Sequence, residues 1–484
     1  MVVRCILAWL LLGAVTAVQA SPRTDPTTGR AVFTGATMSH ATSIGLDPAA
    51  LGLGEFDQVY VAVTSVLDQL HLDLAPYQRA DLSAPSARVR DVELSPGAMF
   101  GFIYHLAGDR GTLGFEARTN PAESFPSRQD ALRYHTLGDG ERDWLASVAA
   151  SIKVTNELYF GASLSHQNTF LRLRYARDTA LENGLTPGGT GRGIGGACGD
   201  GGPCSLADPR ATETYDVDVR SRALSTSNLR VNVGGVIQLA RNLWLGVAYH
   251  TPPGFSVQTE LAGHVTVTRA PRDLSFADDP RVLRGQSVVE IQFPASVDAE
   301  LRARLPFDLD LHVAGRWEDL SRLSAYDVRT YGSTLPRNGI PEWTERPRGM
   351  HDAFALWGGV EQNDTGQTWL LGARIGLETS SVPPARTSPL TIAPMSYTVD
   401  FGAQWRISQL VTAQLSYGLE LFPAVHVTQS AFDPADRLTC IASNYDYATT
   451  ACEAVRRGYA IAPAAGDYGR LEHALRIGLR YDLR

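Results

Sequence analysis

The sequence has little charge, few cysteines and no long apolar run beyond its N-terminus. Charged residues make up 19% of the chain, where roughly 25% is usual in soluble proteins. Lys and Arg number 43 against 51 Asp and Glu, so the basic excess of a nucleic-acid-binding protein is missing. No internal segment approaches the ~18–20 apolar residues of a membrane helix. This composition excludes a helical membrane protein but is compatible with a membrane β-barrel.

The N-terminus has the pattern of an export signal. Arg4 gives a short positive region, residues 6–18 are apolar, and residues 18–20 (Val-Gln-Ala) fit the site that a signal peptidase reads. We therefore expect residues 1–20 to be a signal peptide and Ser21 to begin the mature chain. The alternative is a membrane anchor, for which the apolar run is short.

Four cysteines follow this signal and form two local pairs in polar segments. In an exported protein, Cys198 with Cys204 and Cys440 with Cys452 are predicted to be loop disulfides. The alternative is a zinc site, but neither spacing is CxxC and no histidine stands close by in the sequence. We expect no metal site and no cofactor.

Most of the chain after residue 55 alternates between apolar and polar residues. From Leu471 to Leu483 the odd positions are Leu, His, Leu, Ile, Leu, Tyr and Leu, and the even positions are Glu, Ala, Arg, Gly, Arg and Asp. Residues 411–421, 397–407 and 307–317 repeat the pattern. A period of two separates the two faces of a strand and mixes the faces of a helix.

These strands suit a membrane barrel better than a soluble β-sandwich, whose strands also alternate. Many segments exceed the ~5–6 residues of a typical strand, and their apolar faces end in aromatic residues such as Tyr397, Trp405 and Tyr481. Tight turns also alternate with long loops, as in outer-membrane barrels. We predict an all-β fold, a transmembrane antiparallel β-barrel of about 14 strands over residues 56–484. The strands are expected to begin near Phe56, Arg88, Gly111, Asp143, Glu157, Thr214, Leu243, Gln286, Phe307, Asp352, Gln367, Ser396, Val411 and Leu471.

Residues 21–55 do not alternate and are rich in small residues. Asp47 precedes Pro48, an arrangement that caps a short helical turn, because Pro suits the first helical position. A barrel of about 14 strands encloses a sizeable lumen. We therefore predict that residues 21–55 are a plug inside the barrel; the alternative is a periplasmic tail.

Several short motifs follow one another along the chain. They are Leu-Asp-Pro-Ala at 46–49, Tyr-His at 134–135, Trp-Leu-Gly-Val-Ala-Tyr-His-Thr-Pro at 244–252, Phe-Pro-Ala-Ser at 293–296, Arg-Trp at 316–317 and Arg-Ile-Gly at 374–376. Their order and spacing resemble the FadL/TodX family of outer-membrane transporters for long-chain fatty acids and other hydrophobic compounds. The family's N-terminal hatch carries Asn-Pro-Ala, which Asp47, Pro48 and Ala49 match with Asp in place of Asn.

The resemblance implies passive uptake across the outer membrane of a Gram-negative bacterium. A long-chain fatty acid or other hydrophobic small molecule would bind among external loops and pass to a pocket in the lumen. It would then leave sideways into the membrane lipid, as the hatch moves and a kink in the third strand opens the barrel wall. We expect a monomer without catalytic residues.

A fatty-acid carboxylate needs a cationic partner. By alternation, several cations face inward, and from these we select Arg316 and Arg374 as ligand-binding residues. Each could instead pair with a neighbouring lumenal carboxylate.

Two other functions remain open. A general diffusion porin fits a charged lumen but not a plug. An outer-membrane lipid hydrolase needs a nucleophile beside its base, and in a strand Ser165 and His166 face opposite sides of the sheet.

Overall fold

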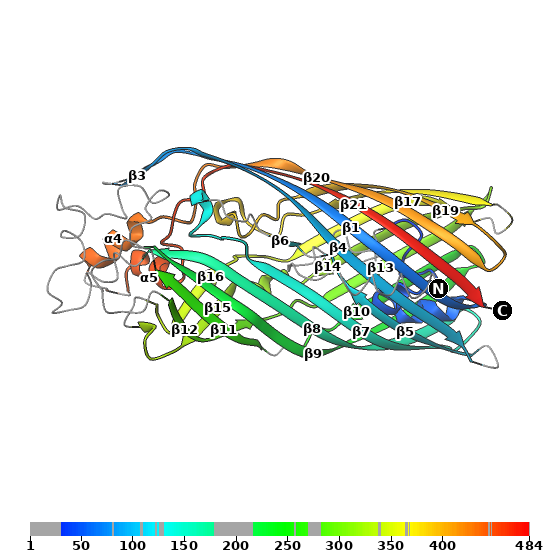
Figure 1. Cartoon of the computed structure of the whole chain (residues 1–484). Coiled ribbons are helices and arrows are strands. Elements are labelled where there is room, and N and C mark those ends of the chain that lie inside the picture. Colours follow the sequence, from blue (N-terminus) through cyan, green and yellow to red (C-terminus); the bar gives the residue numbers. More distant parts are fainter. Residues whose placement is uncertain are drawn as a thin grey trace.

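The protein is a closed antiparallel β-barrel (Figure 1). The computed structural model describes residues 31–483 except 80–81, 107–109, 122, 125–129, 179–215, 256–257, 270–281, 337–339, 364–365, 367, 444–445 and 447. The first long strand, β1 (Asp57–Leu74), pairs along its whole length with the last, β21 (Gly466–Leu483). This pairing closes a sheet of 14 membrane-spanning strands, which confirms the predicted fold class and strand number.

The spans are of two kinds. Uninterrupted spans are β1, β4 (Ala87–His105), β5 (Gly111–Thr119), β7 (Gly140–Lys153), β8 (Leu158–Asp178), β9 (Asp216–Ala240), β18 (Trp369–Glu378), β19 (Ser396–Arg406), β20 (Val411–Val427) and β21. Interrupted spans are β10 (Leu243–His250) with β11 (Thr259–Arg269), β12 (Val282–Ile291) with β13 (Ser296–Leu305), β14 (Leu309–Glu318) with β15 (Ala325–Tyr331), and β16 (Trp343–Pro347) with β17 (Ala353–Gln362). The short β6 (Glu123–Ser124) pairs with β7, and β2 (Tyr77–Arg79) pairs with β3 (Leu82–Ala84).

Most predicted strand starts fall close to the observed ones, and three fall late. The last strand begins at Gly466 and not near Leu471, and β12 begins at Val282 and not near Gln286. The span of β16 and β17 begins at Trp343 and not near Asp352. The late predicted start of β21 has a visible cause. The first residues of this strand lie beyond the apolar band, and the outward side chain there is Asp467, which is 58% exposed. Outside the lipid layer, the outward-facing residues of a strand need not be apolar, so the alternation of apolar and polar residues disappears there.

Helices are few and short. They are α2 (Ser43–Leu46), η2 (Pro48–Leu53), η3 (Asp130–Leu132), η5 (Leu320–Arg322), η7 (Pro384–Arg386), α4 (Ala435–Ala442) and α5 (Thr450–Arg456). The last two form a hairpin within the long loop expected between β20 and β21. No helix in the described ranges has the length and apolar character to span a bilayer.

The alternating residues separate lipid-facing from lumen-facing side chains as expected. On β21, Ile477 and Leu479 are 53% and 48% exposed, whereas Glu472 and Arg476 are almost fully buried. The outer face therefore presents apolar side chains to lipid, and the charges lie inside. Trp369 and Trp405 pair in register near the end with short turns, their rings stacked with centroids 5.4 Å apart.

The third span is short. Strand β5 pairs with β4 only over Ala98–His105, so in the described part of the sheet residues 87–97 of β4 pair with β1 alone. The chain turns away from the sheet at Pro121, which lies against Gly97. In the described residues, the barrel wall is therefore discontinuous beyond the Thr119 end of β5, on the side of the long loops.

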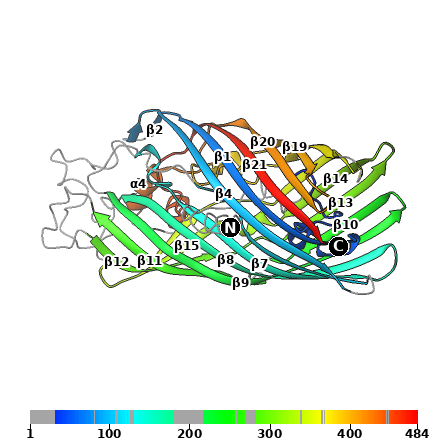
Figure 2. The ribbon, with the colours of Figure 1, turned by 45° about the vertical axis from the view of Figure 1, so that its right-hand side comes forward.

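Residues 31–53, here called the N-terminal segment, pack against lumen-facing side chains of the barrel, near the end where the C-terminus lies (Figure 2). Glycines in the barrel wall allow the N-terminal segment to approach the wall closely. A Cβ on Gly161 of β8 would lie 2.3 Å from the backbone of Pro48 and Ala49, and one on Gly234 of β9 would lie 2.1 Å from Asp47. A Cβ would lie between 2.5 and 2.9 Å from atoms of the segment at five further wall glycines: Gly101, Gly114, Gly246, Gly372 and Gly402.

Replacing Gly161 with Ala is expected to displace the N-terminal segment, because the new methyl group overlaps backbone atoms that cannot rotate away. Amides of residues 49–53 should exchange with deuterium about ten-fold faster, as a ~1.4 kcal/mol loss implies. Gly235→Ala is the matched control, since its nearest neighbour is the Phe160 ring at 3.4 Å. Equal exchange in both variants would contradict the close fit.

Candidate functional site

The predicted turn at Asp47 forms as the sequence indicated. The Asp47 carboxylate accepts a hydrogen bond from the Ala49 backbone N–H at 2.9 Å and caps η2. The Ala49 carbonyl in turn accepts a hydrogen bond from Ser151 Oγ of β7 at 2.9 Å. Side chains of both the segment and the barrel wall thus fix this turn in place.

Asp47 is a buried carboxyl group in a position where the resembling family has an amide. Its side chain is fully buried. Burial is the main cause that raises the pKa of Asp47 well above its usual range, and the nearby carboxylates Asp298 and Glu300 act in the same direction. Burial therefore favours the neutral form of the Asp47 carboxyl group, which resembles the neutral amide of Asn.

The two cations selected from the sequence both lie in the lumen and both contact acids. Arg316 donates to Glu318 at 2.7 Å and lies 3.4 Å from Asp298. Arg374 donates to Glu361 at 2.7 Å and to the Thr34 carbonyl at 2.5 Å. The pairing that the sequence left open is therefore present, and contact of either residue with ligand stays a prediction.

A pocket of about 330 Å³ lies at the other end of the barrel, among the long loops. Its apolar lining includes aliphatic side chains such as Leu390, Val455 and Ile461. It also includes four aromatic side chains from four parts of the chain: Tyr134, Tyr175, Trp343 and Phe432. Its cationic lining is Arg177, Arg346, Arg437 and Arg456. An apolar cavity with a few cations suits a hydrophobic molecule that has one polar end.

Arg346 and His135 hold the base of this pocket together. Arg346 lies 3.0 Å from Asp139, donates to the His135 carbonyl, and has its guanidinium 4.0 Å from the centre of the Tyr175 ring. The His135 ring contacts the Ala462 carbonyl at 2.8 Å and Phe432 edge-on. These contacts join the β8 end, β16 and the loop before β21.

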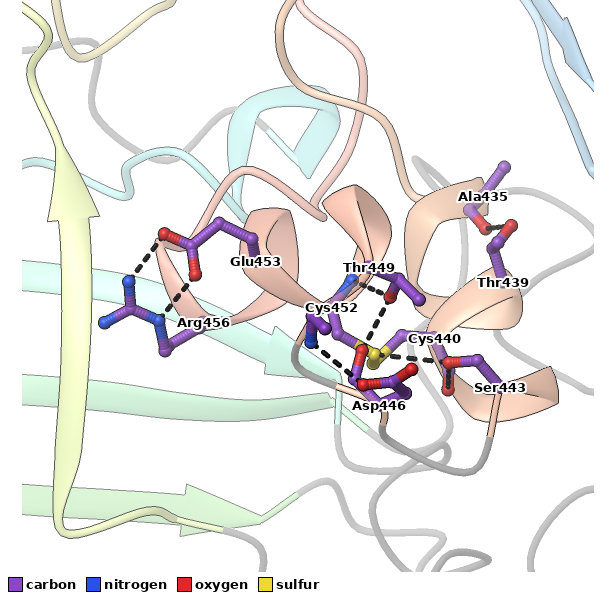
Figure 3. Close-up of a disulfide and its surroundings, with 10 residues drawn as sticks. Ala435, Thr439, Cys440, Ser443, Asp446, Thr449, Cys452, Glu453 and Arg456 are labelled. Atoms are coloured by element: carbon purple, nitrogen blue, oxygen red, sulfur yellow. Dashed lines mark hydrogen bonds and ion pairs between the residues drawn. A yellow bond between two sulfur atoms is a disulfide. The ribbon is translucent and has the colours of Figure 1, made fainter.

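The helical hairpin α4–α5 forms one wall of the pocket. Cys440 and Cys452 join the two helices by a disulfide, as predicted (Figure 3). Glu453 pairs with Arg456 and Arg457, and their hydrogen bonds lower the pKa of Glu453 to about 2. Arg456 therefore reaches the pocket with its charge already partly compensated. The other predicted pair, Cys198 and Cys204, lies outside the described residues.

The sequence did not identify the pocket. Tyr134 and His135 were noted only as a motif, and Phe432, Arg437 and Arg456 lie in a loop without alternation. The local signal was the Cys440–Cys452 pair, which marked an ordered loop. Ser165 is buried while His166 faces outward, so these two residues lie on opposite sides of the sheet, as expected for neighbours in a strand.

Replacing Asp47 with Asn is expected to remove a pH dependence from the N-terminal segment. The pKa of Asp47 is raised in the native state, so the attachment of the N-terminal segment to the wall is most stable below the ordinary carboxyl pKa. This stability decreases as the pH rises through the raised pKa of Asp47. Deuterium exchange of residues 47–53, corrected for intrinsic rates, should therefore accelerate in the wild type as the pH rises above the ordinary carboxyl pKa. D47N should show no such change; the same pH response in D47N would contradict this origin.

Comparisons with solved structures agree on the fold. The chain superposes on a FadL homologue from Pseudomonas aeruginosa with a TM-score of 0.73 at 12% identity, covering 97% of this chain and 99% of that one. The toluene transporter TodX from P. putida matches with a TM-score of 0.60 at 13% identity, over 93% and 95% of the chains. The CymD monoaromatic hydrocarbon channel gives 0.60 at 14% identity, over 97% and 98%.

At the level of sequence, no protein-family model and no curated protein matches the chain. The likeness is therefore one of architecture, and it extends over almost the whole chain. The protein has the 14-stranded barrel fold of the FadL and TodX channels.

Proposed function

We propose that this protein lets small hydrophobic molecules cross the outer membrane of a Gram-negative bacterium passively, as a monomer. One observation carries the proposal: the N-terminal segment packs against lumen-facing side chains at one end, and a pocket with aromatic side chains lies at the other. A molecule entering from the loop side meets an apolar cavity before it meets the plug. Such an arrangement favours ligands that leave water.

The route continues sideways and not straight through. Residues 87–97 of β4 pair only with β1, so the wall above β5 offers an exit from lumen to lipid. A fatty acid gains about 0.8 kcal/mol per CH₂ group buried in an apolar environment, which makes lipid a better destination than a wet pore. The N-terminal segment acts as the hatch that keeps this route closed to water.

The ligand class that the pocket favours is a long-chain fatty acid or a similar hydrophobic molecule. Four aromatic side chains supply the apolar surface, and Arg437 and Arg456 supply positive charge for a carboxylate. The structural relatives named above include a toluene transporter and a monoaromatic hydrocarbon channel, so a neutral aromatic molecule is the second candidate. Within the lumen, Arg316 is the proposed cation along the path.

Replacing Trp343 with Ala is expected to weaken binding of a fluorescent long-chain fatty acid about ten-fold, since an aromatic anchor contributes ~1–2 kcal/mol. Trp369→Ala is the control, because Trp369 is 55% exposed on the outer face. Titration of the refolded barrel in detergent measures both. Equal affinities in the two variants would remove the pocket from the binding site.

The conductance of single molecules in planar bilayers separates this proposal from a general diffusion porin. A barrel in which residues 31–53 close the lumen should pass no large steady ion current, because the segment packs directly against lumen-facing side chains of the wall. A stable open-channel current in the wild type would instead favour the porin.

A further inference from the structure

The two halves of the N-terminal segment, residues 32–37 and 41–53, contact largely different strands. Charged side chains bond the backbone of the first half, and apolar packing holds the second half. Residues 41–53 pack against β1, β4, β5, β7, β8 and β9 through apolar side chains and close contact with glycines. Residues 32–37 lie against β13, β17, β18 and β21 and are held by charged side chains. The halves therefore have separate attachments on different parts of the wall.

Charged side chains bond the first half through its backbone. Glu361 accepts a hydrogen bond from the Phe33 N–H at 2.9 Å, and Glu300 accepts one from the Thr37 N–H at 3.0 Å. Arg374 donates to the Thr34 carbonyl at 2.5 Å. Arg476 donates to the carbonyl of Val32 at 3.2 Å.

These side chains also bond one another. His312 Nδ1 lies 2.6 Å from Glu300 Oε1, and its Nε2 lies 3.6 Å from Glu361 Oε2. Arg374 Nη2 lies 2.5 Å from Glu361 Oε1. All four side chains are at most 2% exposed. We call Glu300, His312, Glu361 and Arg374 the latch cluster.

A polar cavity of about 200 Å³ lies beside Phe33 and beside residues 38–40, which join the two halves. The wall supplies polar and charged side chains near the short turns: Arg302, Arg304, Asp310, Glu361, Gln404, Arg406 and Arg480. Wall glycines approach both halves, since Gly372 and Gly402 lie against Val32. Open space therefore lies next to the first half at Phe33 and at its junction with the second half.

We infer that the latch cluster closes a second, polar path through the barrel. When its bonds to residues 32–37 break, this half of the segment swings into the adjacent cavity and opens a water-filled passage along β13, β14, β17 and β18. Residues 41–53 stay bound to the opposite wall. This path is distinct from the lateral hydrophobic route and would carry small ions, including anions attracted by its arginines.

The latch carboxylates are tested by Glu361→Gln and Glu300→Gln in the full mature chain. An amide keeps the size of the side chain but weakens its bond to a backbone N–H and removes the ion pair. Each variant should show frequent ion-conducting openings in planar bilayers. Deuterium exchange of the amides of residues 33–37 should rise about ten-fold, while exchange of residues 49–53 should stay unchanged.

Glu318→Gln is the matched control, because Glu318 is a buried lumenal acid whose partner is Arg316 of the barrel wall at 2.7 Å, and it bonds no described residue of the segment. Gly35→Ala tests the latch from the other side, since its Cβ would lie 2.4 Å from the Glu300 carboxylate. If E361Q does not fold, as judged by gel mobility without heating, E300Q and G35A carry the same test.

Two results would overturn the inference. One is an unchanged conductance and exchange rate in E361Q, E300Q and G35A. The other is a loss of protection that extends equally over residues 33–37 and 49–53, which would mean that the segment moves as one body. Either result leaves hydrophobic uptake intact, because that function is measured by ligand binding.

Discussion

Backbone hydrogen bonding in an apolar solvent is the constraint on which this structure depends. Lipid offers no partner for a free N–H or C=O, so a sheet that crosses a bilayer must close on itself. The pairing of β1 with β21 along 18 residues does this. Once the sheet is closed, every strand has one face toward lipid and one toward the lumen. Apolar and charged residues must then alternate.

The lumen imposes a second constraint. Charged side chains inside it need partners, and the enclosed space needs atoms that pack into it. Neighbouring strands pair acids with arginines, as Arg316 of β14 does with Asp298 of β13. The N-terminal segment packs against the inner wall, and glycines such as Gly161 and Gly234 allow its backbone to approach the wall. Part of the high glycine content of the chain therefore follows from the fit between barrel and segment.

The sequence predicted those features whose cause lies within a few residues. Period-two alternation revealed the strands, the Asp47-Pro48 pair indicated a capped turn, and Cys440 with Cys452 indicated a loop disulfide; all three are present. Contacts between distant residues were not predictable. Arg374 and Thr34 lie 340 positions apart, and the aromatic pocket gathers residues from four regions with no shared pattern. The strand interruptions near Pro252 and Pro294 also went unpredicted, because alternation resumes after each.

The central claim is that the pocket end of this barrel binds hydrophobic molecules. Titration of the wild-type protein in detergent with a fluorescent long-chain fatty acid tests it most directly. The account predicts saturable binding that an unlabelled fatty acid displaces and a polar solute such as a sugar does not. Signal that rises without saturation, or displacement by the sugar, would contradict it.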